Sequence, residues 1–344
     1  MIRVAVIGAG HWGPNLIANF HDRQRSEVAW VIDRDASRRQ AVGLRFPDIR
    51  VSDDATHAFG DASVDAVVIA TPTSTHFDLA RQALEAGRHV LVEKPMADSV
   101  RDAEALCEIA ERSARILMVG HVFVFNAASQ QAKRYLVDGD LGRIYYISMT
   151  RTNLGPIRVD VNAAWDLASH DIALASYWLD AQPESVSARG TAWINPGVED
   201  AVFATLQYPN DVLVHLHASW LHPRKTRDIT VVGEKRMLTF DDISLTEPLR
   251  IYDKQVSEER SHPALVDSFA TFRMVVRDGD ISVPKVPASQ PLRNECDHFL
   301  DCIESGGVPI TDGREGLAVV RTLDAISRSI AEGGREVRVG GDRR

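Results

Sequence analysis

The chain has 344 residues, of which 25% are charged and 44% are hydrophobic, and its formal net charge is −9. This length is sufficient for two domains with their own cores, and the composition is typical of a globular protein. The acidic balance argues against a general nucleic-acid-binding protein, and no apolar run approaches the roughly 20 residues of a membrane-spanning helix.

Cysteine usage favours a reducing compartment. Cys107, Cys296 and Cys302 are too few and too scattered for a disulfide framework or a metal cluster. The first residues read as a strand rather than as a secretory signal. We therefore expect a cytoplasmic protein with no metal site and with neither a nucleic acid nor a membrane as partner.

Residues 1–122 alternate short apolar strands with amphipathic helices. The strands are expected at 2–7, 28–33, 64–70, 89–93 and 116–120. Helical spacing of apolar residues appears between them at 16–20, 80–84 and 103–110. This alternation is typical of right-handed crossovers that build a parallel sheet. It predicts an α/β, doubly wound domain of the Rossmann kind over residues 1–122.

A glycine-rich turn follows the first strand directly and opens a helix. Gly8 permits the tight turn, Gly10 lets a pyrophosphate approach the backbone, and Gly13 allows the helix to pack closely on the strand. We expect the whole turn to bind a dinucleotide, through the residues Gly8, Ala9, Gly10, His11, Trp12 and Gly13.

The end of the second strand indicates which dinucleotide binds. Asp33 stands about 20 residues after the turn, where a carboxylate can accept both ribose hydroxyls of the cofactor. The same charge repels a 2′-phosphate, so NAD is favoured over NADP. NADP remains the alternative cofactor, because the basic residue Arg34 stands next to Asp33.

Loops at the carboxyl ends of the third and fourth strands face the same crevice. Thr71, Pro72 and His76 are expected to line the cofactor, although His76 could instead begin a helix and face solvent. Glu93-Lys94-Pro95 ends the fourth strand, and Pro95 could follow a cis peptide bond. Lys94 could hydrogen-bond a substrate hydroxyl or the cofactor and stabilise developing alkoxide charge.

Residues 123–344 have a different pattern of expected helices and strands. Helices are expected at 127–137, 165–179, 292–303 and 315–331, and strands at 143–151, 185–194, 201–208, 212–221, 228–232 and 236–240. Strands so close in sequence pair antiparallel. The pattern predicts an α+β substrate-binding and oligomerisation domain over residues 123–344, with a large, mostly antiparallel open sheet. An apolar sheet face needs a cover, which a second copy can supply, so we expect a homodimer or homotetramer.

Asp166 and His170 are four residues apart and share one face of the expected helix. A histidine that is oriented by a carboxylate suits the removal of a hydroxyl proton while hydride leaves the same carbon. Trp165 and Leu167 make a fully solvated face less plausible, and Asp171 should point away from His170. The alternative is a surface ion pair without a catalytic role.

Together these residues resemble the Gfo/Idh/MocA oxidoreductases over nearly the whole chain. The matching motifs are Gly8-x-Gly10-x-x-Gly13, Ala70-Thr71-Pro72 to His76, Glu93-Lys94-Pro95, Gly120-His121 with Asn126, and Asp166-x-x-x-His170. The resemblance implies a two-domain NAD(P)-dependent enzyme acting on sugars or cyclitols. It also implies a catalytic set of Lys94, Asp166 and His170.

Within the family, the chain is similar to nucleotide-sugar 3-dehydrogenases that act on UDP-linked N-acetylated hexoses or hexuronic acids. The residues carrying this similarity include Arg151, Asn153 and Trp165, and with Asn126, Asp166 and His170 they are the expected substrate contacts. The chain departs from many members in having Ala163-Ala164-Trp165, Ser169 and Phe123-Val124-Phe125 around the substrate pocket. These departures bear on which sugar is bound.

Three functions follow from the sequence. The first is an NAD-dependent dehydrogenase that oxidises a secondary alcohol of a sugar, at C3 of a nucleotide sugar. The second is a ketoreductase on a keto-sugar, or an inositol or cyclitol dehydrogenase, with the same site. The third, a non-catalytic NAD(H)-binding regulator, would predict loss of Lys94 or His170, and both are present.

Overall fold

The computed structural model describes residues 1–258 and 274–340, which form two compact units. The first unit contains residues 1–126 and 289–324, and the second contains residues 127–288 and 325–344. This division differs from the boundary predicted after residue 122, because a late segment of the chain returns to the first unit. None of the described helices is both long and apolar enough to cross a membrane.

The first unit is built on a six-stranded sheet in the order β3-β2-β1-β4-β5-β6. Every neighbouring pair in it is parallel, which confirms the predicted doubly wound fold. The strands are β1 (Ile2–Ile7), β2 (Ser26–Ile32), β3 (Arg50–Ser52), β4 (Ala66–Ile69), β5 (His89–Glu93) and β6 (Leu117–Gly120). The strand order reverses between β1 and β4, and ligands of such sheets bind at this switch point.

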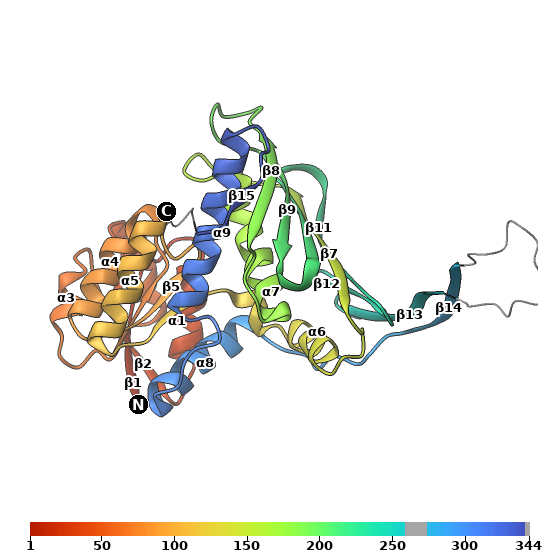
Figure 1. The fold of residues 1–344 in the computed structure, drawn as a ribbon. Coiled ribbons are helices and arrows are strands. Elements are labelled where there is room, and N and C mark those ends of the chain that lie inside the picture. Colours follow the sequence, from red (N-terminus) through yellow and green to blue (C-terminus); the bar gives the residue numbers. More distant parts are fainter. Residues whose placement is uncertain (259–273, 341–344) are drawn as a thin grey trace, which may run out of the picture. The chain divides into compact units, whose positions relative to one another are not determined.

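Helices flank this sheet, and α4 and α5 lie side by side (Figure 1). The helices that follow strands β1 to β5 are α1 (Gly13–His21), α2 (Ala36–Arg45), α3 (Thr56–Gly60), α4 (His76–Glu85) and α5 (Val100–Ser113). The short helices η1 (Thr73–Thr75) and η2 (Val122–Phe125) follow β4 and β6. The three-residue strand β3 and the helices α2 and α3 were not predicted, because none of them carries a clear apolar repeat.

Helix α8 (Pro291–Ser305) and the start of α9 (Gly313–Ala331) complete the first unit. Phe299 packs edge-on against Phe20 of α1, with ring centroids 6.4 Å apart. Between the two helices, Thr311 exchanges hydrogen bonds with Val119 of β6: the Val119 N–H donates to the Thr311 carbonyl, and the Thr311 hydroxyl donates to the Val119 carbonyl, each at 2.8 Å. These contacts explain why residues 289–324 belong with the first unit.

The second unit is built on a nine-stranded sheet in the order β14-β13-β12-β11-β7-β10-β9-β8-β15. Its pairs are antiparallel except β7 with β10, as predicted for a mostly antiparallel sheet. The strands are β7 (Ile144–Leu154), β8 (Ser185–Thr191), β9 (Ala201–Tyr208), β10 (Val212–Ser219), β11 (Leu221–Gly233), β12 (Met237–Asp241), β13 (Leu249–Glu258), β14 (Met274–Ser282) and β15 (Val337–Arg338).

Helices lie on one side of this sheet (Figure 1). They are α6 (Ala127–Val137), the π-helical turn η3 (Ala164–Ala168), α7 (Ser169–Leu179) and the end of α9. Trp178 of α7 packs edge-on against Phe240 of β12, with centroids 5.9 Å apart. The opposite face leaves Tyr146, Phe203 and Leu213 exposed on three neighbouring strands.

Candidate active site

The glycine turn between β1 and α1 is packed so tightly that two of its positions exclude a side chain. Gly8 has a φ of +99°, and a Cβ there would lie 2.5 Å from the carbonyl oxygen of Ala70. A Cβ on Gly13 would lie 2.0 Å from the Gly8 carbonyl oxygen. A Cβ on Gly10 would instead approach the flexible Arg38 guanidinium at 3.4 Å. This cradle at a helix N-terminus fits a dinucleotide pyrophosphate.

Asp33, directly after β2, is held by the same turn. Its Oδ2 accepts the backbone N–H of Ala9 at 2.7 Å, and its Oδ1 accepts that of Asp35 at 2.8 Å. The carboxylate is therefore fixed beside the glycine turn, where an adenosine ribose would be bound.

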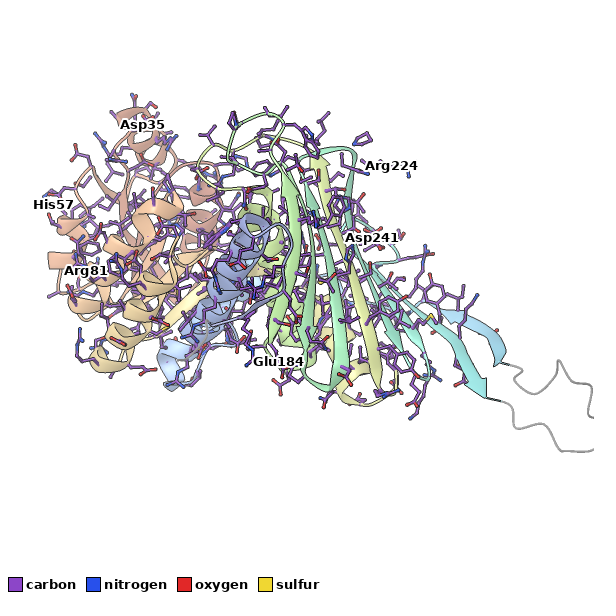
Figure 2. All side chains as sticks on the ribbon, turned by 45° about the horizontal axis from the view of Figure 1, so that its top comes forward. Asp35, His57, Arg81, Glu184, Arg224 and Asp241 are labelled. Carbon is purple, nitrogen blue, oxygen red and sulfur yellow. The ribbon has the colours of Figure 1, made fainter. Side chains whose placement is uncertain are left out.

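The basic residue beside Asp33 is Arg38 rather than Arg34. Arg38 Nη1 lies 3.5 Å from Asp33 Oδ2, and the side chains of both Arg38 and Arg34 are exposed. Asp35, labelled in Figure 2, caps α2 by accepting the N–H groups of Ser37 and Arg38. That cap places Arg38 in the first turn of α2. Recognising Asp35 as an N-cap in the sequence would have predicted this position.

His76 links the loop after β4 to the end of the next strand. Its ring is 1% exposed, with Nδ1 2.9 Å from the Pro95 carbonyl oxygen and Nε2 2.9 Å from that of Thr71. The buried ring contradicts the alternative that His76 faces solvent, and its expected place beside the cofactor stays a prediction. Thr71 is half-buried and Pro72 is exposed, so both remain candidates for cofactor contact.

Glu93-Lys94-Pro95 ends β5 at the same edge of the sheet, and the Lys94–Pro95 peptide bond is cis. The Glu93 carboxylate accepts the Lys94 backbone N–H at 3.3 Å and a hydrogen bond from the Trp12 side chain. Desolvation raises the pKa of Glu93 to about 7, although the Lys94 charge opposes this shift. Trp12 and its neighbour His11 are otherwise exposed.

His121 follows β6 and is buried close to Lys94. Burial, together with the positive charge of Lys94, lowers the pKa of His121 to about 3. The ring is therefore neutral at physiological pH. Asn126, an expected substrate contact, ends η2 in this first unit, with a half-buried side chain.

Asp166 lies in the second unit, within the π-helical turn that precedes α7. Its Oδ1 accepts a hydrogen bond of 3.2 Å from Arg158, and its Oδ2 accepts one of 3.1 Å from the indole N–H of Trp220. The sequence predicted one continuous α-helix here. π-helical turns are rare and occur frequently at functional sites. Trp220 escaped prediction because no local pattern connects it to a residue so distant in the chain.

His170 lies in the first turn of α7 with a half-buried ring, whereas most of that helix is buried. Its neighbour Asp171 is buried and accepts two hydrogen bonds from Arg151, at 2.9 and 2.7 Å. Arg151 is 4% exposed. Arg151 thus forms a buried ion pair with Asp171, and its expected contact with the substrate stays a prediction.

The remaining expected substrate contacts also lie in the second unit. Trp165 donates its indole N–H to the Ser327 hydroxyl of α9 at 3.1 Å, which anchors the π-helical turn. Asn153 is half-buried near the end of β7. Lys94 and Asn126 thus belong to the first unit, while Asn153, Trp165, Asp166 and His170 belong to the second.

Comparison with known families matches both units. Residues 2–121 match the oxidoreductase family with an NAD-binding Rossmann fold, and residues 129–239 match the Gfo/Idh/MocA C-terminal domain. The chain belongs to the Gfo/Idh/MocA oxidoreductase family. It is therefore an oxidoreductase whose first unit binds NAD, as the glycine turn and Asp33 indicated.

Several relatives are similar over most of the chain. UDP-N-acetylglucosamine 3-dehydrogenase of Acidithiobacillus ferrooxidans is 30% identical over 328 residues, covering 93% of this chain and 94% of the relative. Its crystal structure has a TM-score of 0.81 at 27% identity and 97% and 99% coverage. The WlbA dehydrogenase of Bordetella pertussis, solved with NADH and UDP-GlcNAcA, has a TM-score of 0.78 at 25% identity and 99% coverage of each chain.

An inositol dehydrogenase is also similar, over a shorter region. The scyllo-inositol 2-dehydrogenase (NAD(+)) of Bacillus subtilis is 32% identical over 207 residues, which cover 58% of this chain and 60% of that enzyme.

Proposed function

We propose that this protein oxidises a secondary alcohol of a nucleotide sugar, at C3, with NAD as the hydride acceptor. The observation that carries the proposal is the full-length similarity to a UDP-N-acetylglucosamine 3-dehydrogenase, which spans both units. Each unit contributes some of the residues that this chemistry requires. Lys94 directly follows β5 beside an ionisable carboxyl. Asp166, in the π-helical turn η3, lies one turn before His170 of α7.

Each of these side chains has a distinct part in the proposed reaction. Bound NAD would supply the acceptor for the hydride that leaves the carbinol carbon. His170 accepts the hydroxyl proton, because a neutral imidazole is a suitable base near physiological pH. Asp166 orients the ring and stabilises its protonated form, in the manner of carboxylate–histidine pairs elsewhere. Lys94 donates a hydrogen bond to the same oxygen as negative charge develops on it.

Basic side chains of the second unit support a diphosphate-bearing substrate. Arg151 and Arg227 are engaged by Asp171 and Asp242, at 2.7 and 2.9 Å. By contrast, Arg224 and Lys225 of β11 have exposed side chains, and Arg224 lies at one end of the sheet in Figure 2. A phosphate group favours such exposed cations.

A panel of substrates tests the proposal. The purified protein with NAD should produce NADH absorbance with UDP-N-acetylhexoses or the corresponding uronic acids. Lys94→Ala should lower turnover at least about a hundredfold, as loss of one preorganised donor does elsewhere, with a far smaller change in NAD affinity. Turnover with free inositols alone would reject the nucleotide-sugar assignment and favour the second candidate, a cyclitol dehydrogenase similar to the Bacillus subtilis enzyme.

The ketoreductase reaction uses the same groups in the reverse direction. Incubation of the protein with NADH and a keto-sugar tests this alternative.

We also propose that the protein is a cytoplasmic homodimer or homotetramer. Tyr146, Phe203 and Leu213 are exposed on one sheet face, and a second copy of that face would cover them. The three cysteines are free and buried, which suits a reducing compartment. Sedimentation at several concentrations measures the assembly state, and a monomer at all of them would contradict the proposal.

A further inference from the structure

Glu295 is a carboxyl group buried inside the first unit. It lies on α8, its side chain is 0% exposed, and neither of its oxygens has a hydrogen-bond partner among the described residues. An ionised carboxylate without a partner is very unfavourable in such a place, and the group takes up a proton instead. The role of this buried acid depends on its neighbours.

Helix α8 brings Glu295 to the strand ends that carry Glu93. Asn294, the residue before it, donates its side-chain N–H to the Phe125 carbonyl of η2 at 3.0 Å. Helix η2 begins shortly after Gly120, which pairs with Glu93 in the sheet. The Glu93 carboxyl lies against Gly120, where a Cβ would meet both of its oxygens at 3.2 Å.

Electrostatics couple the two carboxyl groups. Burial raises the pKa of Glu295, and the negative charge of Glu93 raises it further. The Lys94 charge acts in the opposite direction on Glu93. The first ionisation of the pair therefore belongs to Glu93, and Glu295 keeps its proton.

Other charged or titratable groups lie on the segments packed around α8, and two of them are already satisfied. Arg23 is paired with Asp297 at 2.8 Å, and His121 is neutral because burial lowers its pKa. Beside α1 and η2 these groups are His21, Arg23 and His121. On α8 itself they are Arg293, Cys296, Asp297, His298, Asp301, Cys302 and Glu304. Glu93 remains the charged group that acts on Glu295.

We propose that Glu295 is a positioning residue for Lys94. Glu295 stays protonated, so the single negative charge of the Glu93–Glu295 pair lies on Glu93. That charge is next in sequence to Lys94, and Glu93 Oε2 accepts the Lys94 backbone N–H. By staying neutral, Glu295 preserves the negative charge on Glu93 and the hydrogen bond from the Lys94 backbone N–H to Glu93, which together hold the Lys94 segment. The catalytic consequence rests on the proposed function, whereas the protonation state of Glu295 does not.

Infrared difference spectroscopy on the intact protein tests the protonation state. Ordinary carboxyl groups are ionised at pH 8, since their pKa values are about 4. The wild type should nevertheless show the carbonyl band of a protonated acid at pH 8, and Glu295→Gln should lack it. Asp297→Asn, on the same helix, should retain it. In Glu93→Gln the band should disappear at a lower pH, because the repulsive charge is gone. A wild type without the band, or a Glu295→Gln protein that keeps it, would overturn the proposal.

Thermal stability gives a second test that needs no substrate. The folded-state pKa of Glu295 is raised above the unfolded value of about 4.3. Its contribution to stability is therefore complete below that pH and is lost as pH rises. Glu295→Gln cannot ionise, so its melting temperature relative to wild type should increase from pH 5 to pH 9. A difference that changes in the opposite direction would show that Glu295 is ionised and partnered.

The link to Lys94 is tested by the pH profile of NAD-dependent oxidation. Glu295→Leu removes a polar neighbour of Glu93. This should move the acid limb of kcat/KM to higher pH, through the part of that limb that Glu93 contributes in addition to His170. Glu295→Gln keeps a polar group and should leave that limb in place, and NAD affinity should be unchanged in both. The same limb in all three proteins would overturn the positioning role. If no sugar is oxidised at all, the proposed function fails while the spectroscopic and stability tests still decide the state of Glu295.

Discussion

The indole N–H of Trp220 donates a hydrogen bond of 3.1 Å to Asp166, although 54 residues separate the two in the chain. Trp220 is 1% exposed, so the donor is fixed by the packing around it. Arg158 binds the other carboxylate oxygen at 3.2 Å. Asp166 is thus held from two sides, which suits the role proposed for it, that of a carboxylate orienting a histidine.

This relationship predicts the effect of Trp220→Phe. The substitution removes the hydrogen bond but retains an aromatic ring in the core. Turnover should fall by about tenfold or more, because a hydrogen bond to a charged group is worth roughly 1.5–3 kcal/mol. NAD affinity should not change. Trp193→Phe is the matched control, since Trp193 is 62% exposed in the same unit. Equal turnover in both variants would show that Asp166 does not depend on Trp220.

A second prediction concerns the choice of cofactor. Asp33→Ser should weaken NAD binding and relax the discrimination against NADP, because it removes a charge that repels a 2′-phosphate. Arg38, 3.5 Å from Asp33, is the cation that would then meet the phosphate. Adding Arg38→Ala should abolish the gain in NADP affinity, whereas adding Arg34→Ala should not. The dissociation constants of both cofactors measure this. A wild type that prefers NADP would contradict the role of Asp33.

Much of the first unit could be predicted from sequence because its signals are local. The glycine turn, the alternating apolar segments and the acidic residue after β2 each depend on neighbours a few residues apart. The return of α8 and α9 could not be predicted in this way. It depends on contacts such as Phe20 with Phe299, which are made by residues at opposite ends of the chain.

In the candidate site, too, features that depend on local spacing could be predicted, and contacts between residues distant in sequence could not. Local spacing placed Lys94 at a strand end and Asp166 one turn before His170. The partners of these groups are distant in sequence, so the pairing of Arg151 with Asp171 was not predicted. His76 illustrates a further reason: its motif indicates a site, but only packing shows that both ring nitrogens lie 2.9 Å from backbone carbonyl oxygens.

The buried pair of Arg151 and Asp171 leads to a third prediction, on stability. Asp171→Ala removes the carboxylate that accepts two hydrogen bonds from the buried Arg151 guanidinium, and it should cost about 3–5 kcal/mol of unfolding free energy. The double variant Arg151→Met with Asp171→Leu removes both charges and should recover much of that loss. Denaturant unfolding measures both values. Full stability in Asp171→Ala would mean that Arg151 has another use, such as the substrate contact first expected.

The last prediction concerns His170 as the base. Sugar hydroxyls are very weak acids, and loss of hydride without a base would produce an unfavourable protonated carbonyl. A neutral imidazole, whose ordinary pKa is about 6.5, accepts that proton at physiological pH. Oxidation should therefore decrease as pH falls through this range, because the imidazole is then already protonated.

Substitution separates His170 from the other titrating groups. His170→Ala should lower activity roughly 100- to 10,000-fold and remove most of this pH dependence. Asp166→Asn should act in the same direction but more mildly, because the ring remains. His57→Ala is the control: His57 is an exposed histidine of α3, labelled in Figure 2, and its loss should leave the profile unchanged. Stopped-flow measurement of NADH formation between pH 5 and 9 gives these profiles. Retained activity with an unaltered profile in His170→Ala would assign proton removal to Lys94 instead.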